Sequence, residues 1–553
     1  MKRDLEALAS RRHDLLIVGG GIHGACIARD AALRGLSVAL VDRSDFGSGA
    51  SQNSLKILHG GLRYLQGFDL ARMRASILER SILARIAPHL VEPLGFLLPL
   101  GGGRGPDPLA MALALRVADL AGSDRNRDLP PELRIPGGRI TGRRFLRSLA
   151  LPAGFDGARS VALWHDLRVR NTERMTMAFL LSACEHGAIA INHARVDRLL
   201  RLEDGAIAGV HVADTLGDNR IDVRAKAVVV AAGSWTAEIL DDLQGRPASP
   251  DRPQALAVNL LTRRPAPPFA LGFRSAAAPP GDPAGRGRTC FLVPHRGATM
   301  IGTFYRVHRG PSDGYAITEE LLASFVEECN AAWPELRLRV EEIEGCHHGL
   351  LPCDISADGL RLAQRPRIRD HAAGDGHPGL ISVEGVKYTT ARLVAEKVSN
   401  LVFERLHRRS PPCWGRVEAL PGGEKGTMRA EESAAGSPAV ARLIRLHGSR
   451  YRSLPSRGEE PESSWISPMP GIGASRAEIL HPIREEAAMR LSDLVLRRTE
   501  IAADGPPGEA CVAAIAAAIA PEMGWPASRW EAEVADTLAE LRPWEEKAWA
   551  SAP

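Results

Sequence analysis

The chain has 553 residues, 44% of them hydrophobic, and a net charge of +4 at pH 7. This much apolar sequence is enough for two or three packed domains, and it excludes a disordered chain, a collagen-like repeat and a small disulfide-stapled scaffold. Because the 70 basic residues nearly balance the 66 acidic ones, we expect no nucleic-acid partner. The eight cysteines form no C-x-x-C pair, so we predict neither a disulfide framework nor a metal site.

The sequence contains no obvious membrane-spanning or export segment. Residues 1–13 are charged and lack the apolar core of a signal peptide. The longest apolar run, residues 510–520, has 11 residues, well short of the roughly 20 that a membrane-spanning helix needs. We therefore expect a cytoplasmic protein that is soluble or, at most, peripheral on the inner face of the cytoplasmic membrane. Residues 109–120 fit a helix in the bilayer interface as well as a packed helix.

The first predicted elements form a βαβ unit: residues 14–18 are an apolar strand, residues 22–34 a helix and residues 37–41 a second strand. The α/β pattern fades after residue 60 and returns beyond residue 140. The later predicted elements are helices at 70–86, 109–120, 172–186 and 388–406, strands at 189–191, 227–231 and 380–383, an antiparallel insertion at 252–345, a linker at 408–421 and helices from 428 onward.

A glycine-rich turn joins the first strand to the first helix. Residues 19–24 read G-G-G-I-H-G, a G-x-G-x-x-G motif in the strand–turn–helix context that dinucleotide binding requires. Gly19 permits the tight turn, Gly21 lets the backbone approach a pyrophosphate at the helix N-terminus, and Gly24 lets helix and strand pack closely. Asp42, after the second strand, can accept a hydrogen bond from a ribose hydroxyl. We predict a dinucleotide site here; the alternative is a glycine-rich turn in an ordinary α/β domain.

Two later segments bear on whether the dinucleotide is FAD or NAD. Residues 227–235 form an apolar strand that ends in Ala232 and Gly233, small residues that let a cofactor approach the chain, although a core strand with a turn would look similar. The distance of this segment from the glycine turn is typical of flavoproteins. Residues 381–392 lead from a strand into a helix, where Lys387 either stabilises the negative charge of a reduced flavin or faces solvent.

Longer motifs carry a resemblance to a known family. They are S-L-K-I-L-H-G-G-L-R-Y-L at residues 54–65, A-P-H-L at 87–90, I-G-T at 301–303, G-V-K-Y-T-T at 385–390, L-P-G-G at 420–423, R-E-E-A at 484–487 and L-R-R-T at 496–499. On these residues and the glycine turn, the chain resembles the FAD-dependent glycerol-3-phosphate dehydrogenase and oxidase family over nearly its whole length.

The resemblance implies a fold of the α/β class. An FAD-binding Rossmann-like domain of the glutathione-reductase type would carry an inserted antiparallel substrate domain and be followed by an all-α C-terminal domain. We place the oxidoreductase domain at residues 1–420 and the helical domain at 421–553. Within the first, the FAD-binding segments would lie at about 12–100, 150–250 and 345–407, and the substrate-side insertion at about 251–345.

The resemblance also implies a reaction. The enzyme would oxidise the C2 alcohol of sn-glycerol 3-phosphate to dihydroxyacetone phosphate by hydride transfer to N5 of FAD, and pass the electrons to a quinone at a membrane surface or to oxygen. The implied catalytic residues are His59, Arg63, Tyr64, Arg365 and Lys387. The implied FAD-binding residues are Gly19, Gly21, Ile22, Gly24, Asp42, Arg43, Ser54, Lys56, His59, Gly60, Gly61, Ala232, Gly233, Gly385, Lys387, Tyr388 and Thr389.

The substrate side departs from the family pattern. Where the family has G-V-R-P-L, residues 349–353 read G-L-L-P-C, so that Leu351 replaces a substrate-facing arginine. The family's K-G-S-H run is missing from residues 253–258, and I-G-T-T-D is changed to I-G-T-F-Y at 301–305. The neighbouring His347 and His348 either compensate for the arginine or are ordinary surface histidines.

Three functions stay open on this basis. The first is a glycerol-3-phosphate dehydrogenase with a reshaped site. The second is a related FAD-dependent oxidoreductase that acts on a different alcohol, polyol phosphate or amine, in a less charged pocket lined by Leu351, Phe304 and Tyr305. The third is a non-catalytic FAD-binding paralogue, against which the retained cations argue.

The general base is one of three histidines. A base must take the hydroxyl proton while the hydride leaves C2. His59, His295 and His348 can each be neutral near pH 7, and we favour His59.

Overall fold

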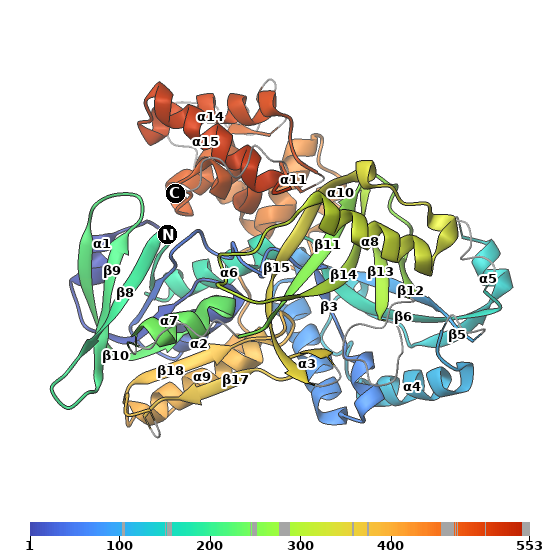
Figure 1. Ribbon diagram of the computed structural model, residues 1–553, viewed down its shortest axis with the longest axis horizontal. Helices are drawn as coiled ribbons and strands as arrows, with labels where there is room; N and C mark the ends of the chain where they lie inside the picture. Colours follow the sequence, from blue (N-terminus) through green and yellow to red (C-terminus); the bar gives the residue numbers. More distant parts are fainter. Residues whose placement is uncertain are drawn as a thin grey trace.

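Two β-sheets and a group of C-terminal helices make up the molecule, which we describe from a computed structural model. A largely parallel sheet lies on the left in Figure 1, a largely antiparallel sheet lies beside it, and the C-terminal helices lie above both. The structure describes residues 1–101, 105–149, 151, 158–243, 245, 252–275, 288–356, 359–372, 375–454, 469, 472, 474–503 and 505–544.

The first sheet is built around the predicted βαβ unit. Strand β1 (His13–Val18) pairs in parallel with β2 (Val38–Val41) on one side and with β10 (Arg220–Val230) on the other. Strands β1 and β2 and the last residues of β10 are near-continuous apolar runs, as expected where both faces of a sheet are covered. The order across the sheet is β17–β18–β10–β1–β2–β7, with a β8–β9 hairpin attached to β10; the remaining bounds are β7 Ile189–Ile191, β8 Ala194–Arg201, β9 Ile207–Asp214, β17 Arg367–Asp370 and β18 Leu380–Glu384.

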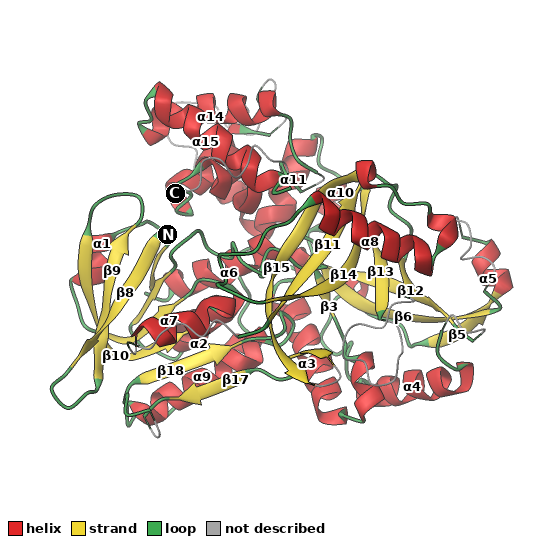
Figure 2. Cartoon of the chain, in the orientation of Figure 1, coloured by secondary structure: helices red, strands yellow, loops and turns green. Residues whose placement is uncertain are grey.

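Helices cover the two faces of this sheet (Figure 2). On one face α2 (Ile22–Leu33) packs against α6 (Thr172–Glu185) and α9 (Ala391–Arg405). The β8–β9 hairpin packs on the other face together with α1 (Leu5–Ala9) and α7 (Thr236–Leu243). The predicted elements of this region agree with β1, β2, β7, β18, α2, α6 and α9 to within a few residues, and β10 is longer than predicted. The elements α1, α7, β8, β9 and β17 have no counterpart among the sequence predictions.

The parallel register sets the place of the glycine turn. Val18, the last residue of β1, pairs with Val41 of β2 and Val230 of β10. The carboxyl ends of these strands therefore meet at one edge of the sheet, the usual place for a ligand in an open α/β sheet.

The second sheet draws on more of the chain than the predicted insertion. Its strands come from residues 57–169 as well as from 254–362, and α8 (Glu319–Ala332) covers its outer face. The order is β16–β15–β11–β14–β13–β12–β4–β6–β3, with β5 paired to β6. The bounds are β3 Ile57–Leu58, β4 Val91–Pro99, β5 Arg139–Gly142, β6 Ser160–Val169, β11 Gln254–Thr262, β12 Ala270–Arg274, β13 Thr289–His295, β14 Ala298–His308, β15 Ile343–Ser356 and β16 Gly359–Leu362.

The C-terminal part is helical, as predicted, and has its own apolar core. A π-helical turn, Asp493–Arg498, faces the first sheet's domain. The predicted domain boundary at residues 420/421 stays a prediction. The helices here are α10 Arg429–Ser433, α11 Pro438–His447, α13 Arg476–Glu485, α14 Glu509–Met523 and α15 Ala527–Leu541, and those beside the second sheet are α3 Leu70–Ile86, α4 Pro108–Ala121 and α5 Arg143–Arg147.

Candidate active site

The glycine turn is made possible by two backbone contacts that leave no space for side chains. Gly19 has φ of +107°, and a Cβ on it would lie 2.7 Å from the carbonyl oxygen of Ala231. A Cβ on Gly24 would lie 1.9 Å from the carbonyl oxygen of Gly19. Gly21, the N-cap of α2, has no side chain to occupy the first-turn N–H groups of the helix. The turn therefore brings backbone N–H groups to a positive helix end, which suits a pyrophosphate; of these, the Ile22 N–H donates to the Ser51 hydroxyl at 2.9 Å.

Asp42 closes the turn from the second strand. Its carboxylate accepts hydrogen bonds from the backbone N–H of Gly20, at 2.6 Å, and of Ser44, at 2.8 Å. Burial raises the pKa of Asp42 to about 6, against the lowering effect of these two bonds. Asp42 thus holds the loop to the turn, and it keeps the lone pairs needed to accept a ribose hydroxyl.

A cavity of about 2060 Å³ runs from Asp42 along the loop 48–56 to Lys387, between the two sheets. It is lined by most of the predicted site residues: Gly19, Gly21, Ile22, Asp42, Arg43, Ser54, Lys56, His59, Gly61, Arg63, Tyr64, Ala232, Gly233, Gly385, Lys387, Tyr388 and Thr389. Its volume and the glycine turn on its wall fit a dinucleotide.

Three predicted site residues are outside this lining. Gly24 packs against the Gly19 carbonyl, and the Gly60 N–H donates to the Asp166 carboxylate at 2.7 Å, so both shape the wall from behind. The Arg365 side chain is 75% exposed and forms an ion pair with Asp69 at 3.0 Å. Contact of Arg365 with a substrate stays a prediction.

At the Lys387 end of the cavity, cations surround one aromatic ring. The Lys387 ammonium donates to the Tyr64 hydroxyl and lies 4.2 Å from the centre of the Tyr64 ring, and the Arg72 guanidinium lies 4.7 Å from the same centre. Burial, with Arg63 and Arg72 nearby, lowers the pKa of Lys387 to about 8. Arg63 makes no hydrogen bond or ion pair with any residue that the structure describes. This end therefore carries positive charge that an anionic ligand would neutralise.

His59 also lines the cavity, and a buried acid lies near its ring. Its Nδ1 lies 3.6 Å from Asp166, and the side chain of His59 is 54% exposed, whereas Asp166 is buried. Burial works against ionisation of Asp166, but Arg80 and His59 together hold its pKa below the usual range. Asp166 could not be predicted from the sequence, because it lies on β6, far along the chain from His59. A histidine beside a buried carboxylate is a common arrangement for a general base.

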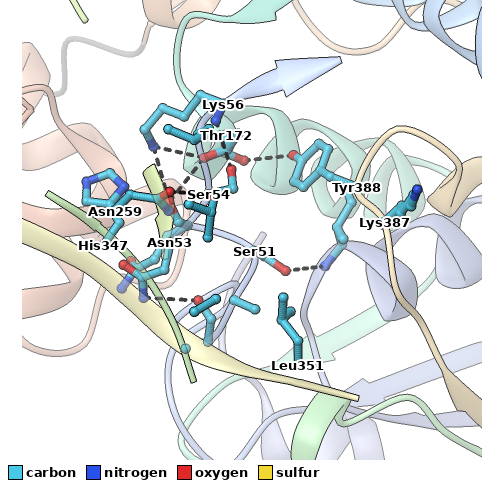
Figure 3. A pocket seen from close by; sticks show the side chains of 18 of the residues that line it. Ser51, Asn53, Ser54, Lys56, Thr172, Asn259, His347, Leu351, Lys387 and Tyr388 are labelled. Carbon is cyan, nitrogen blue, oxygen red and sulfur yellow. Dashed lines mark hydrogen bonds between the residues drawn. The ribbon is translucent and has the colours of Figure 1, made fainter. Parts of the chain in front are cut away.

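Lys56 is neutralised by the protein itself (Figure 3). Its ammonium donates to Glu173 at 2.6 Å and to the Thr172 hydroxyl at 2.9 Å. Burial lowers the pKa of Lys56, and Glu173 counteracts that effect. Lys56 lines the cavity, but its ammonium is already paired with the Glu173 carboxylate.

The altered substrate-side residues divide into two groups. Leu351 and Tyr305 line the cavity, as expected. The expectation that Phe304 lines it is wrong: Phe304 is fully buried on the other face of β14, where it stacks on Phe325 of α8 at 4.8 Å. Neighbouring residues of a strand point to opposite faces, so only one of residues 304 and 305 can face the cavity.

The neighbouring histidines are not surface residues. His347 and His348 both line the cavity, and the latter shares a hydrogen bond with the Tyr315 hydroxyl at 3.0 Å. His295, the remaining candidate base, lies 2.9 Å from the carbonyl oxygen of Ala503. Burial lowers the pKa of His347 and of His348 to about 4 and that of His295 well below its ordinary value. Of the three candidate bases, His59 has the strongest geometric support.

Comparisons with known proteins agree with this geometry. Residues 14–400 match the family model described as FAD dependent oxidoreductase, and residues 413–530 match the model described as C-terminal domain of alpha-glycerophosphate oxidase. Glycerol-3-phosphate dehydrogenase 1 of Mycobacterium tuberculosis is 31% identical over 516 residues, which are 90% of this chain and 93% of that protein. The chain belongs to the FAD-dependent glycerol-3-phosphate dehydrogenase family.

Other members of the family and a solved structure extend the match. The glycerol-3-phosphate dehydrogenase of Synechocystis is 27% identical over 95% of both chains. The crystal structure of the glycerol-3-phosphate dehydrogenase from Bacillus halodurans, complexed with FAD, superposes with a TM-score of 0.73 over 99% of this chain and 98% of that one, at 22% identity. The predicted fold class is confirmed, the cofactor is FAD and the protein is an oxidoreductase.

Replacing Gly19 by alanine should abolish FAD binding. The new Cβ would collide with the Ala231 carbonyl, and the positive φ is unfavourable for alanine. We expect the purified variant to be colourless and folded by circular dichroism. The control is Gly508→Ala, at a glycine with nothing within 4 Å of the added Cβ. FAD retained at a wild-type level by the Gly19 variant would contradict the assignment of this turn.

The Lys387 pKa predicts a pH effect on the stability of FAD-free protein. The folded pKa of about 8 is below the ordinary 10.5, so between these values the unfolded chain binds more protons and stability rises with pH. The free energy of unfolding of the wild type minus that of Lys387→Met should rise by about 3 kcal/mol from pH 8 to pH 10.5. This follows because one pKa unit corresponds to about 1.4 kcal/mol. Urea unfolding of both proteins across the window measures it, and a difference independent of pH would contradict the buried cation.

Proposed function

We propose that this protein oxidises sn-glycerol 3-phosphate to dihydroxyacetone phosphate and transfers the hydride to FAD. The observation that carries the proposal is a cavity lined by Arg63, which has no acidic partner among the described residues, by the half-buried Lys387 beside Tyr64, and by His59, whose ring lies near the Asp166 carboxylate. A phosphate needs the cations, and a secondary alcohol needs the base. The relatives at about 30% identity are named for this activity.

The residues divide the chemistry as follows. Arg63 holds the phosphate, and His59 takes the hydroxyl proton while Asp166 keeps its ring in place. Lys387 supplies positive charge at the flavin end of the cavity, which favours accumulation of negative charge there. When bound, FAD supplies the hydride acceptor. Arg365 pairs with Asp69 at the rim, and we retain it as a predicted substrate-proximal residue.

One observation favours a second candidate, a related oxidoreductase for a less polar alcohol, polyol phosphate or amine. Leu351 packs with Tyr305, Leu362 and Cys353 in an apolar cluster. The wall where the family places a substrate-facing arginine therefore lacks charge, which would weaken binding of a second polar group of the substrate. The two candidates differ in the substrate, but they use the same FAD site.

We further propose that the protein works as a peripheral membrane protein and passes electrons to a quinone. Leu109, Leu113 and Leu120 of α4 are 82%, 65% and 78% exposed. Together with Arg116 they have the spacing of one helix face, a pattern that suits a bilayer surface with anionic lipids. Within the described residues, every helix is too short or too polar to cross a membrane. Oxygen is the alternative acceptor.

Two substitutions should move activity in opposite directions. Arg63→Ala removes a cation that has no partner among the described residues, so flavin reduction by sn-glycerol 3-phosphate should slow by about a hundredfold, equivalent to about 2.7 kcal/mol. Leu351→Arg restores a cation to the family position and should lower the KM for the same substrate. Stopped-flow kinetics measure both, with Arg408→Ala, a surface arginine paired with Asp14, as control. Wild-type rates in Arg63→Ala would exclude a phosphate contact at this residue.

The membrane proposal predicts selective loss of vesicle binding. The double variant Leu109→Ser/Leu113→Ser should sediment less with vesicles that contain phosphatidylglycerol, with little change in stability because both side chains are exposed. Leu202→Ser is a matched control, since Leu202 is 50% exposed next to the β8–β9 hairpin, at the far end of the molecule from α4. Equal sedimentation of the double variant and the wild type would contradict the proposal.

A further inference from the structure

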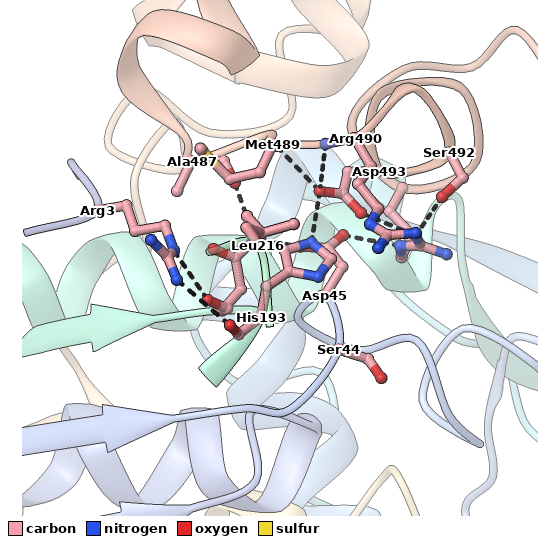
Figure 4. Close-up of polar contacts among 12 residues, drawn as sticks. Arg3, Ser44, Asp45, His193, Leu216, Ala487, Met489, Arg490, Ser492 and Asp493 are labelled. Atoms are coloured by element: carbon pink, nitrogen blue, oxygen red, sulfur yellow. Dashed lines mark hydrogen bonds and ion pairs between the residues drawn. The ribbon is translucent and has the colours of Figure 1, made fainter. Parts of the chain in front are cut away.

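The C-terminal domain contacts the loop that follows β2, residues 42–49 (Figure 4). The contact is made by the π-helical turn Asp493–Arg498, which lies against this loop and His193. His193 binds both sides: its backbone N–H donates to the Ser44 carbonyl at 3.0 Å, and its Nε2 lies 2.9 Å from Asp493. The loop that runs beside the glycine turn is therefore part of an interface between domains.

Asp45 is the centre of this interface. It is 1% exposed, and both of its carboxylate oxygens are bound. Arg498 donates to the two oxygens at 2.7 and 2.8 Å, Arg497 donates through Nε at 2.7 Å, and Asn192 donates at 2.9 Å. Arg497 and Arg498 are also buried. Buried ions that satisfy one another are costly to separate, because loss of one partner leaves the other charged and desolvated.

The residues next to Asp45 connect it to the glycine turn. The Phe46 side chain is buried against Gly20, where an added Cβ would lie 2.5 Å from the Phe46 ring. The Gly47 N–H donates to the Gly20 carbonyl at 3.1 Å, and the Asp42 carboxylate accepts from the Gly20 N–H. Movement of Asp45 would therefore displace Phe46 and Gly47, the next two residues. Both contact Gly20, so the displacement would reach the backbone of the glycine turn beside the cofactor site.

The same C-terminal segment also reaches the cavity directly. Leu496 and Thr499, which flank the two arginines, are among the lining residues. Residues 496–499 therefore form part of the cavity wall and also hold the loop 42–49 in place.

We propose that the C-terminal domain is a clamp for the cofactor: the Asp45–Arg497–Arg498 contact holds the loop 42–49 against the glycine turn, so that domain docking and FAD binding stabilise each other. Arg497 and Arg498 are then positioning residues that act on FAD through Asp45. Because coupling between two sites is reciprocal, bound FAD must stabilise the docked C-terminal domain to the same extent as docking tightens FAD binding.

The test compares two matched substitutions in the full chain. Asp45→Asn removes the charge at the loop. Glu486→Gln removes an equally buried charge from the same domain interface, where the Glu486 carboxylate accepts from Arg174 of α6 at 2.6 and 2.7 Å. The Glu486 backbone carbonyl, which accepts from Arg498 at 3.3 Å, is kept in this variant. The Kd for FAD is measured by titrating apoprotein and following the quenching of flavin fluorescence, and the release rate is measured on dilution. Thermal unfolding of both apoproteins reports their stability.

We expect Asp45→Asn to raise the Kd for FAD about tenfold or more, equivalent to about 1.4 kcal/mol, and to speed its release. Glu486→Gln should lower the stability of the apoprotein while leaving the Kd within about twofold of wild type. A wild-type Kd and release rate in Asp45→Asn would overturn the clamp, and so would an equal rise in Kd in both variants, because the effect on FAD would then not depend on the Asp45 contact.

Two further measurements cover the case in which Asp45→Asn does not fold. Arg498→Lys keeps the charge but loses the paired hydrogen bonds to Asp45, and should raise the Kd by a smaller factor than Asp45→Asn would. In the wild-type protein, hydrogen exchange of residues 491–499 should slow when FAD is added to the apoprotein. Exchange rates in that segment that are the same with and without FAD would contradict the reciprocal coupling.

Discussion

The approach of α2 to the backbone at the ends of β1 and β10 is the constraint on which the cofactor site depends. It requires glycine at positions 19 and 24, because carbonyl groups occupy the space of their side chains. Once this contact is made, the N-terminus of α2 lies at the edge of the sheet. Because the strands are parallel, the same edge also carries the loop after β2, the end of β10 and the turn after β18. The second sheet then closes the opposite wall, so that the position of the cavity is a consequence of the parallel register.

Charge pairing divides that cavity into two parts. Along the loop after β2, buried ions are neutralised within the protein, as Lys56 is by Glu173 and Asp45 is by Arg498. Around Tyr64 the balance is different, because Arg63 lacks an acidic partner among the described residues and Lys387 is held at a lowered pKa. Uncompensated positive charge facing a cavity costs stability, and such sites are typical of function. This asymmetry supports an anionic substrate at the Tyr64 end.

Much of this could be predicted from the sequence because the signals are local. The βαβ unit, the glycine turn and the motif at residues 54–65 each combine neighbouring residues with a fixed spacing. Asp166, Glu173 and the Asp45–Arg498 pair could not be found in this way, since each depends on pairing between segments more than 100 residues apart. Phe304 was misplaced for a different reason: the composition of a strand does not reveal which of its faces points to the cavity. Leu351 was correctly expected at the cavity, although its apolar neighbours became visible only in the folded chain.

The most direct test of the account is an anaerobic half-reaction of the FAD-loaded protein. Purified protein is mixed with sn-glycerol 3-phosphate, and separately with glycerol and with other polyol phosphates, while the visible absorbance of the flavin is followed. The account predicts rapid bleaching by sn-glycerol 3-phosphate, much slower bleaching by glycerol, and formation of one dihydroxyacetone phosphate per flavin reduced. Flavin that is reduced by dithionite but not by sn-glycerol 3-phosphate would contradict the proposed reaction and would show that the cavity beside Leu351 serves another substrate.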